Sequence, residues 1–406
     1  MCAANCEVRC AETCLMQAEL DIRLPAGARV AVAMSGGVDS STVAALLVEA
    51  GFEVIGLTAR LYDVDSADLE TVRRAGTCCA PDDARDARSV SRKLGIRHYV
   101  LDEREAFAAA VTSKFIDDWR NARTPNPCVE CNRTLKFERL TEHARTLGAA
   151  ALATGHYARL GADDAGRPLL RRAIDQSKDQ AYFLYPLRPE VASFVRFPLG
   201  TMSKAEVRAH ARRLGVAVAD KPESMDICFT AGRTPAQYVG EHGAAVSGHI
   251  VDVNGTRLAK HANLAKFTVG QRKGLGIATA ASTEPRRFVL DKRADGTVVV
   301  GPRELLQVHA LRIQDYSSVV GDSLTVGQRV TVQVRHRGTP VAAEVTNVMV
   351  DCVEIAVLSA LEGAARGQSA VLWHDGRVLG GGIIADVRSA GSERLRNAAA
   401  RAPGAA

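Results

Sequence analysis

Residues 33–41 of this chain are Ala33-Met34-Ser35-Gly36-Gly37-Val38-Asp39-Ser40-Ser41. A short apolar run at 29–32 precedes the stretch and a helical pattern at 42–50 follows it, so we predict a strand that turns through Ser-Gly-Gly into a helix. Glycines let a backbone approach phosphate closely, and a helix N-terminus offers free N–H groups and a positive dipole end. The hydroxyls of Ser35, Ser40 and Ser41 can add donors, and Asp39 can hold a metal ion or cap the helix. The stretch therefore predicts a cradle for an anion.

The predicted cradle is not a P-loop, because no lysine follows its glycines. Its Ser-Gly-Gly-x-Asp-Ser order resembles the pyrophosphate loop of enzymes that adenylate a substrate with ATP and release pyrophosphate. That likeness implies ATP and Mg²⁺ as cofactors. The alternative is an ordinary tight turn between a strand and a helix.

Strand and helix patterns alternate through the first half of the chain. We expect strands at 30–34, 53–57, 98–101 and 150–154, and helices at 40–50, 81–94, 105–119 and 135–147. This alternation predicts an α/β fold with a doubly wound parallel sheet. Such sheets bind ligands beyond the carboxyl ends of their strands, where the cradle, the segment after Leu57 and Gly155-His156 all fall.

The pattern changes after Cys228 to short strands broken by Gly, Asn and Asp. We expect strands at 247–253, 268–269, 288–290, 297–300, 329–335, 341–348, 353–358, 369–373 and 377–379. The spacing from residue 308 onward predicts a small β-barrel or sandwich. The chain is thus predicted to hold a disordered leader (1–20), a catalytic domain (21–231), a central domain (232–302), a C-terminal β-barrel (303–387) and a flexible basic tail (388–406).

Composition narrows the class of protein. None of the 406 residues belongs to a run of about 18 apolar residues, and no basic segment with a long apolar core follows the first methionine. We therefore expect a cytoplasmic protein that does not enter a membrane. The net charge of +6 permits a polyanionic partner.

Ten cysteines in a chain expected in the cytoplasm argue for chemistry or metal binding rather than structural disulfides. Cys2, Cys6, Cys10 and Cys14 repeat every fourth residue, for which a metal site is one interpretation and a disordered leader the other. Cys78 and Cys79 are adjacent, so both cannot easily face one site. Cys352 lies in a strand pattern and is expected in a core.

The remaining three cysteines, Cys128, Cys131 and Cys228, lie in turn-rich stretches. Two prolines fix the backbone of the first stretch before a helix expected from Asn132. A thiol at the N-terminus of that helix, with arginines nearby, should have a lowered pKa, so Cys131 is expected to be reactive.

These three thiols allow several interpretations. Cys128 and Cys131 could form half of a zinc site that Cys228 or a histidine such as His156 completes. All three could instead hold three irons of a [4Fe–4S] cluster, which leaves one iron open to sulfide. Cys131 and Cys228 could also form a redox pair, in which one carries a persulfide and the other resolves it. Unrelated loop thiols are the remaining alternative.

Taken together, the pyrophosphate loop and the cysteines resemble the tRNA-specific 2-thiouridylases (the MnmA/TrmU family of PP-loop ATP-pyrophosphatases), which replace O2 of the wobble uridine with sulfur. The resemblance covers roughly residues 28–386. Besides the loop, its motifs here are Arg123-Thr-Pro-Asn-Pro127, Cys131-Asn132, Leu135-Lys-Phe137, Ala153-Thr-Gly-His-Tyr157, Lys178-Asp-Gln180, Tyr182-Phe-Leu-Tyr185, Ile227-Cys-Phe229, Val269-Gly-Gln-Arg-Lys-Gly-Leu-Gly276 and Gly380-Gly-Gly-Ile-Ile384.

The resemblance implies a role for each matching residue. Cys131 would be the nucleophile and Cys228 the persulfide carrier, and the two could form a disulfide. The implied ATP-binding residues are Ala33, Met34, Ser35, Gly36, Gly37, Val38, Asp39, Ser40, Ala59 and Gly155. Those implied to contact the target base are Asn126, Pro127 and Cys128, and those implied to contact tRNA are His156, Lys178, Asp179, Gln180, Arg335, His336 and Gln368.

The implied partners are the anticodon arm of tRNA and an upstream sulfur donor, such as a cysteine desulfurase or a relay protein, and we expect a monomer. One position departs from the best-known branch of the family, which has aspartate where this chain has Cys128. A thiol substitutes poorly for a carboxylate near neutral pH, so an acid–base role is in doubt there. The change does supply a third soft ligand for a cluster.

Two other functions compete with this hypothesis. Another adenylating ligase or amidotransferase would share the loop, but it would leave the three thiols unexplained. A non-catalytic RNA-binding or iron–sulfur carrier protein would need no ATP cradle.

Overall fold

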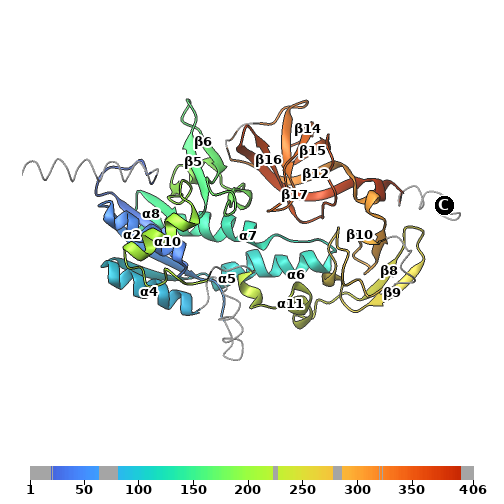
Figure 1. Cartoon of the computed structure of the whole chain (residues 1–406), viewed down its shortest axis with the longest axis horizontal. Helices are drawn as coiled ribbons and strands as arrows, with labels where there is room; N and C mark the ends of the chain where they lie inside the picture. The colour runs from blue at the N-terminus through green and yellow to red at the C-terminus, as the bar shows by residue number, and fades with distance from the viewer. Residues whose placement is uncertain are drawn as a thin grey trace, which may run out of the picture.

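The computed structural model describes residues 20, 22–63, 81–222, 227–277, 286–319, 321 and 323–394. The predictions for Cys2, Cys6, Cys10, Cys14, Cys78 and Cys79 lie outside the described residues. The described part is elongated, with the parallel sheet at one end and the barrel and a central sheet together at the other (Figure 1).

A five-stranded parallel sheet carries the cradle, with strand order β3-β2-β1-β4-β7. Its strands are β1 (Arg29–Ala33), β2 (Glu53–Arg60), β3 (Arg97–Asp102), β4 (Ala151–Thr154) and β7 (Val195–Arg196). Side chains alternate between its faces: Val30 and Val32 join one apolar cluster, whereas Ala31 joins a second cluster with Ile55 and Leu57. Both faces are therefore buried, and the predicted doubly wound sheet is confirmed.

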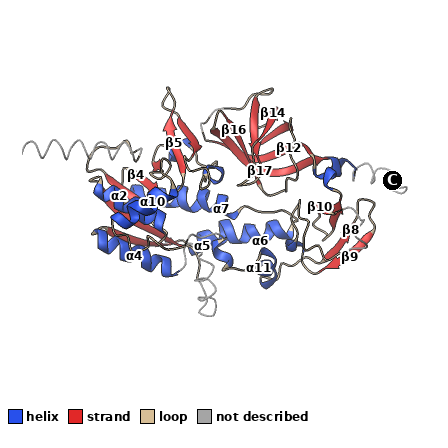
Figure 2. Ribbon diagram, in the orientation of Figure 1, coloured by secondary structure: helices blue, strands red, loops and turns tan. Residues whose placement is uncertain are grey.

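Helices cover both faces of this sheet (Figure 2). On one face lie α2 (Val38–Glu49) and α4 (Pro81–Leu94), with α10 (Lys204–Arg213) packed on α2, and on the other lies α8 (Leu140–Thr146). Two longer helical stretches each contain a π-helical segment: α5 (Arg104–Phe107), η1 (Ala108–Thr112) and α6 (Ser113–Arg120) form one, and α7 (Pro127–Glu130), η2 (Cys131–Arg139) and α8 form the other. The shorter helices are η3 (Ala181–Phe183), α9 (Pro189–Ala192), η4 (Cys228–Thr230), α11 (Pro235–Glu241), η5 (Leu264–Lys266) and η6 (Arg303–Leu306).

The C-terminal strands close into a six-stranded barrel, because β12 pairs with both β15 and β17. Its strands are β12 (Val308–Ser318), β13 (Arg329–Gln333), β14 (Val341–Val348), β15 (Cys352–Val357), β16 (Ser369–His374) and β17 (Arg377–Ser389). Cys352 is buried at the start of β15, as expected. The barrel prediction is confirmed in preference to a sandwich.

A smaller sheet lies between the parallel-sheet part and the barrel in the sequence. It has strand order β10-β11-β8-β9, made of β8 (Gly248–Val251), β9 (Arg257–His261), β10 (Phe288–Lys292) and β11 (Val298–Gly301). Residues 268–269, predicted as a strand, instead form a loop and turn.

One hairpin was not predicted, and two of the predicted boundaries need correction. A hairpin that the sequence analysis missed, β5 (Ala158–Ala162) and β6 (Pro168–Arg172), extends the barrel sheet through the pairing of Arg171 with Arg377. Residue 388, predicted to begin the tail, is still in β17, where Arg388 pairs with Ala310. Leu20, predicted to end the leader, is buried in the apolar core around the parallel sheet.

The three parts meet at residues 123–125, which we call the strap. Lys292 of β10 is buried, and its Nζ donates to the Arg123 carbonyl (3.4 Å) and the Thr124 hydroxyl (3.3 Å). From the barrel side, the Thr124 amide donates to the Arg366 carbonyl at 2.7 Å, and Gln368 Nε2 donates to the Thr124 carbonyl at 3.1 Å. The strap is thus held by the central sheet and by the barrel at once.

Burial makes the charge of Lys292 sensitive to pH. Desolvation, aided by the nearby positive charge of Arg366, lowers the pKa of Lys292 to about 7. Between about pH 7 and pH 10.5 the unfolded chain therefore binds a proton that the folded chain has released, so the free energy of unfolding should rise with pH across this window. Lys292→Met should remove that part of the pH dependence, as measured by urea unfolding at several pH values. Parallel pH profiles for the two proteins would contradict this prediction.

Candidate active site

A cavity of about 310 Å³ lies at the carboxyl ends of the parallel strands. Its walls include every predicted ATP-binding residue except Gly36, namely Ala33, Met34, Ser35, Gly37, Val38, Asp39, Ser40, Ala59 and Gly155. The cavity volume is in the range of small-molecule sites. The cradle, the end of β2 and the turn after β4 thus meet at one place, as the sheet topology predicts.

Ser35 and Ser40 contact each other within the cradle. The Ser40 hydroxyl accepts the Ser35 amide at 3.1 Å and lies 3.3 Å from the Ser35 hydroxyl. Gly37 is the N-cap of α2, so no side chain caps the first N–H groups of the helix, and the first-turn residues Val38, Asp39 and Ser40 line the cavity. Ser41 was predicted to add a hydroxyl donor to the cradle. Its side chain is instead fully buried and does not line the cavity.

Asp39 is the central carboxylate of the cradle. Its Oδ1 accepts the Tyr157 hydroxyl at 2.9 Å and lies 2.6 Å from the Lys204 ammonium. Lys204 is the first residue of α10, and its side chain is only 11% exposed. The cradle therefore has a lysine after all, which comes from a distant helix instead of the loop.

Lys221 binds the other side of the cradle. Its Nζ donates to the Gly36 carbonyl at 3.3 Å and to carboxylates of α4, Asp83 at 2.7 Å and Asp86 at 2.5 Å. Burial alone would lower the pKa of Lys221, but the hydrogen bonds and charges of the two carboxylates outweigh burial and raise it. The charged side chain of Lys221 thus links the cradle to α4.

One part of the remaining cavity wall is apolar. Leu57, Leu61, Leu135 and Leu140 line it together with Met34, a set suited to the face of a nucleobase. His156 also lines it, and complete burial lowers the pKa of His156 well below its usual range, so its ring is neutral. The side-chain carboxylates on the wall are Asp39 and Asp83, oxygen ligands of the type that Mg²⁺ uses.

Two of the predicted reactive cysteines belong to one apolar cluster. Cys131 is buried at the start of η2, and the half-buried Cys228 at the start of η4 packs against the same cluster. The Tyr62 hydroxyl donates to the Cys228 carbonyl at 3.0 Å and helps to fix that turn. Leu61 and Leu135 belong both to this cluster and to the cavity wall, so the cluster adjoins the cavity.

The environment of Cys131 differs from the prediction in one respect. The helix begins at Pro127 rather than Asn132, so Cys131 lies one turn inside it. The arginines near it are paired, Arg133 with Glu130 at 2.5 Å and Arg123 with Asp118 at 3.8 Å. The argument that a free helix end lowers the pKa of this thiol therefore does not hold.

Cys128 lies in the first turn of α7 and is exposed, unlike Cys131. Within the part of the chain that the structure describes, no group of three or more His, Cys, Asp or Glu side chains is placed to hold a metal ion. The cluster and zinc hypotheses thus gain no support from the arrangement of the side chains, and the iron content of the protein must test the cluster.

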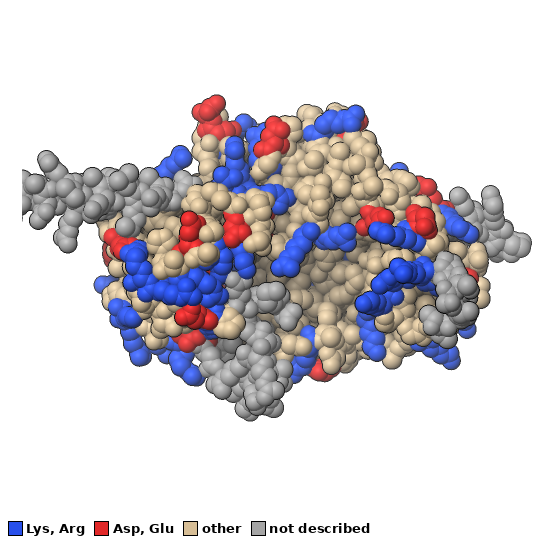
Figure 3. Space-filling model, in the orientation of Figure 1, with Lys and Arg blue, Asp and Glu red and all other residues tan. Residues whose placement is uncertain are grey.

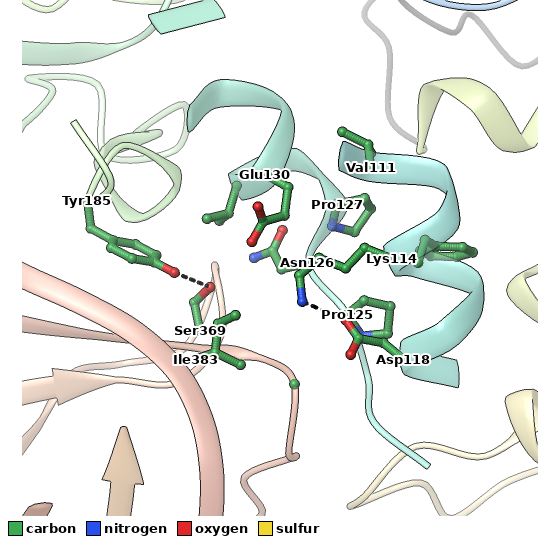
Figure 4. Close-up of a pocket in the computed structure, with 13 residues that line it drawn as sticks. Val111, Lys114, Asp118, Pro125, Asn126, Pro127, Glu130, Tyr185, Ser369 and Ile383 are labelled. Carbon is green, nitrogen blue, oxygen red and sulfur yellow. Dashed lines mark hydrogen bonds and ion pairs between the residues drawn. The ribbon is translucent and has the colours of Figure 1, made fainter. Parts of the chain in front are cut away.

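The loop that carries the residues predicted to contact the target base borders a second, very small cavity of about 10 Å³ (Figure 4). Asn126 and Pro127 line it from the loop, and Tyr185 faces Ser369 of the barrel, with their oxygens 3.3 Å apart. Gln368, a predicted tRNA contact, donates Nε2 to the carbonyls of Thr124 and Pro125. In this structure its amide therefore supports the loop.

The other predicted tRNA contacts lie in two places. Lys178, Gln180 and His156 line the large cavity, whereas Asp179 is buried and accepts the Ala173 amide and an Arg172 N–H. The remaining two residues are at the end of β13: Arg335 is exposed, and the ring of His336 lies 4.5 Å from that of Phe183.

Several residues of the site were not predicted to bind ATP. Lys136, Tyr157, Lys204, Lys221 and Asp83 all line the cavity. Lys136 and Tyr157 lie inside quoted family motifs, which gave a usable signal. Nothing local to Lys204 or Lys221 marks them, because their place in the site depends on how α10 packs.

Comparison with known proteins gives the class of this fold. Family models match residues 28–232 (described as the tRNA methyl transferase HUP domain), 236–302 (tRNA methyl transferase PRC-barrel domain) and 308–384 (aminomethyltransferase beta-barrel domain). The first match and the cradle define a nucleotide-binding HUP domain. An NMN synthetase from Francisella tularensis gives a TM-score of 0.30 at 19% identity, over 52% of this chain and 74% of that chain, a likeness too weak to argue from.

Curated relatives narrow the class further. The tRNA-specific 2-thiouridylase MnmA of Azorhizobium caulinodans is 44% identical over 90% of this chain and 95% of its own length. Those of Methylobacterium sp. and Caulobacter vibrioides are each 43% identical, over 91% and 90% of this chain and 98% and 96% of their own. This chain belongs to the tRNA-specific 2-thiouridylase family. No helix in the described residues is long and apolar enough to cross a membrane.

Gly36 offers a direct test of the cradle. Its φ is +73°, and an added Cβ would lie 2.6 Å from the Asp83 Cα and closer still to its carbonyl oxygen. Gly36→Ala should therefore weaken ATP binding about tenfold or more, since such backbone strain costs about 1–3 kcal/mol. Gly37→Ala is the matched control, because the nearest atom to its Cβ would be the Ser35 hydroxyl at 3.6 Å. Equal ATP affinities of the two variants in calorimetry would refute the assigned role of this backbone.

Proposed function

We propose that this chain is a sulfurtransferase that uses ATP to convert the wobble uridine of tRNA to 2-thiouridine. The observation that carries the proposal is the adjacency of the two sites: Leu61 and Leu135 separate an anion cradle from a cluster with two cysteines. An adenylating ligase needs the first site alone, whereas a thiolating enzyme needs both. The names of the relatives agree with this choice.

The first step we propose is adenylation of the uridine. The C2 oxygen attacks the α-phosphate of ATP, which makes AMP the future leaving group and releases pyrophosphate into the cradle. The N–H groups at the start of α2 would bind that anion. Asp39 and Asp83 would hold Mg²⁺, which supplies neutralisation of the developing phosphate charge.

Sulfur transfer follows at the cysteine cluster. The terminal sulfur of a Cys228 persulfide attacks C2, and AMP leaves. The Cys131 thiolate then attacks the Cys228 sulfur, so that a Cys131–Cys228 disulfide forms and the terminal sulfur remains on the base. An external dithiol returns both cysteines to the reduced state. The alternative is that Cys128, Cys131 and Cys228 hold a [4Fe–4S] cluster that presents the sulfur, and then no disulfide forms.

The distribution of Lys and Arg on the surface supports tRNA as the polyanionic partner of this protein. Figure 3 shows Lys and Arg along the borders of a hollow in the middle of the molecule, between the barrel and the part below it. Phosphate contacts of this type give affinity, while an unstacked anticodon base can be read in a pocket. We propose cytoplasmic action on the anticodon arm, by a monomer that receives sulfur from an upstream donor such as a cysteine desulfurase or its relay protein.

The two cysteines should affect sulfur transfer but not adenylation. In single turnover with unmodified tRNA, Cys131→Ser and Cys228→Ser should each reduce 2-thiouridine below detection by nucleoside mass spectrometry, while tRNA-dependent pyrophosphate release continues. Cys352→Ala is the control, because that thiol is buried in the barrel. If both serine variants still formed thiouridine, the cysteines would not carry the sulfur.

Iron content separates the two sulfur routes. Protein that has been purified anaerobically, freed of iron with a chelator and loaded with persulfide should thiolate tRNA and form one disulfide per thiouridine. The readouts are bound iron, nucleoside mass spectrometry and peptide mapping of Cys131 and Cys228. Activity that follows iron content, without a disulfide, would establish the cluster instead.

A further inference from the structure

Lys204 supplies a positive charge that the loop of the cradle does not contain. A P-loop carries a lysine directly after its glycines, but this loop continues with Val38 and Asp39. In the folded chain the Lys204 ammonium lies 2.6 Å from Asp39 Oδ1 on the wall of the cavity. A positive charge is thus delivered to the start of α2 from the start of another helix.

The position of this lysine is fixed by local structure. A capping box joins Ser203 and Glu206 at the start of α10, and the Lys204 amide donates to Asp175 Oδ2 at 3.0 Å. Val207 and Ala211, on the buried face of α10, belong to the same apolar cluster as the buried residues of α2. Because the helix is held at its start and along its length, the side chain approaches the cradle from a fixed base.

The contacts of the cavity lysines distinguish Lys204 from Lys221. Lys221 already binds two carboxylates and a carbonyl, so its charge is compensated within the protein. Lys204 lies against Asp39, which is also the cradle carboxylate suited to a metal ion. When Mg²⁺ and a polyphosphate enter together, Asp39 can pair with the metal and Lys204 with a phosphate oxygen, so neither charge is left unpaired.

We propose that Lys204 is a phosphate-binding residue of the ATP site, released from Asp39 when the magnesium nucleotide binds. The inference rests on the proposed function, since it concerns the ATP of that reaction. It assigns to α10 the role that a P-loop lysine has within its own loop. The competing explanation is that Lys204 only neutralises Asp39 and never contacts the nucleotide.

A second substitution at Asp39 separates these two explanations. Calorimetry would measure the affinities for ATP, inorganic pyrophosphate and adenosine, with Mg²⁺ present, for the full chain, Lys204→Met, Asp39→Asn and the double variant. Removal of a charged hydrogen bond should weaken ATP and pyrophosphate binding by roughly 10- to 100-fold in Lys204→Met. The same substitution should weaken both ligands again when it is made in the Asp39→Asn background, where no carboxylate remains to neutralise.

Two controls guard against a general effect on folding. Adenosine has no phosphate, so its affinity should be the same in the full chain and in Lys204→Met. Arg212→Met removes a positive charge from the same helix at a side chain that is 59% exposed and paired with Asp220, and it should leave all three affinities unchanged.

The outcomes decide between the hypotheses. An unchanged ATP and pyrophosphate affinity on adding Lys204→Met to Asp39→Asn would overturn the phosphate-binding role and leave charge neutralisation. Loss of adenosine binding in Lys204→Met would also overturn it, because the defect would then lie in the pocket as a whole. If the unsubstituted chain binds neither ATP nor pyrophosphate, the proposed function itself fails. If it binds both and thiolates tRNA, only the inference about Lys204 is at stake.

Discussion

The close approach of Gly36 to the backbone of Asp83 is the constraint on which the site depends. With φ at +73° and no room for a Cβ, the cradle can lie against the first turn of α4 only because residue 36 is glycine. This contact brings the N-termini of α2 and α4 to one cavity, where both dipoles favour an anion. Lys221 holds the arrangement by joining the Gly36 carbonyl to two carboxylates of α4.

The strap at residues 123–125 connects this site with the rest of the molecule. Gly367 of the barrel has φ of +91° and packs so closely that a Cβ would lie 2.8 Å from that of Arg123. Lys292 of the central sheet holds the strap from another side and lies over the ring of Trp119 at 4.4 Å. The strap leads directly into the helix of Cys131, so both C-terminal parts support the backbone that positions this cysteine.

The sequence predicted those features that depend on local pattern. The Ser-Gly-Gly turn, the alternation of strands and helices, and the barrel all follow from spacing and composition, and the structure agrees. Lys204 and Lys221 could not be found in this way, because their positions depend on the packing of α10 and on the path of the chain after it. The start of the Cys131 helix was placed too late because Pro127 was taken to fix a loop, although proline is well suited to the first turn of a helix.

The anion cradle and the cysteine cluster differ in how each should interact with water. Phosphate charge needs donors and cations, which α2 and Lys204 place at the cradle, whereas the proposed sulfur transfer to an adenylated base would have to exclude water that would return the base to uridine. Phe107, Phe115 and Phe229 pack on one another in the apolar cluster that contains Cys131 and borders Cys228. The wall shared through Leu61 and Leu135 places the cavity beside the apolar cluster of Cys131 and Cys228, which is the arrangement that the proposed transfer of sulfur to an activated base requires.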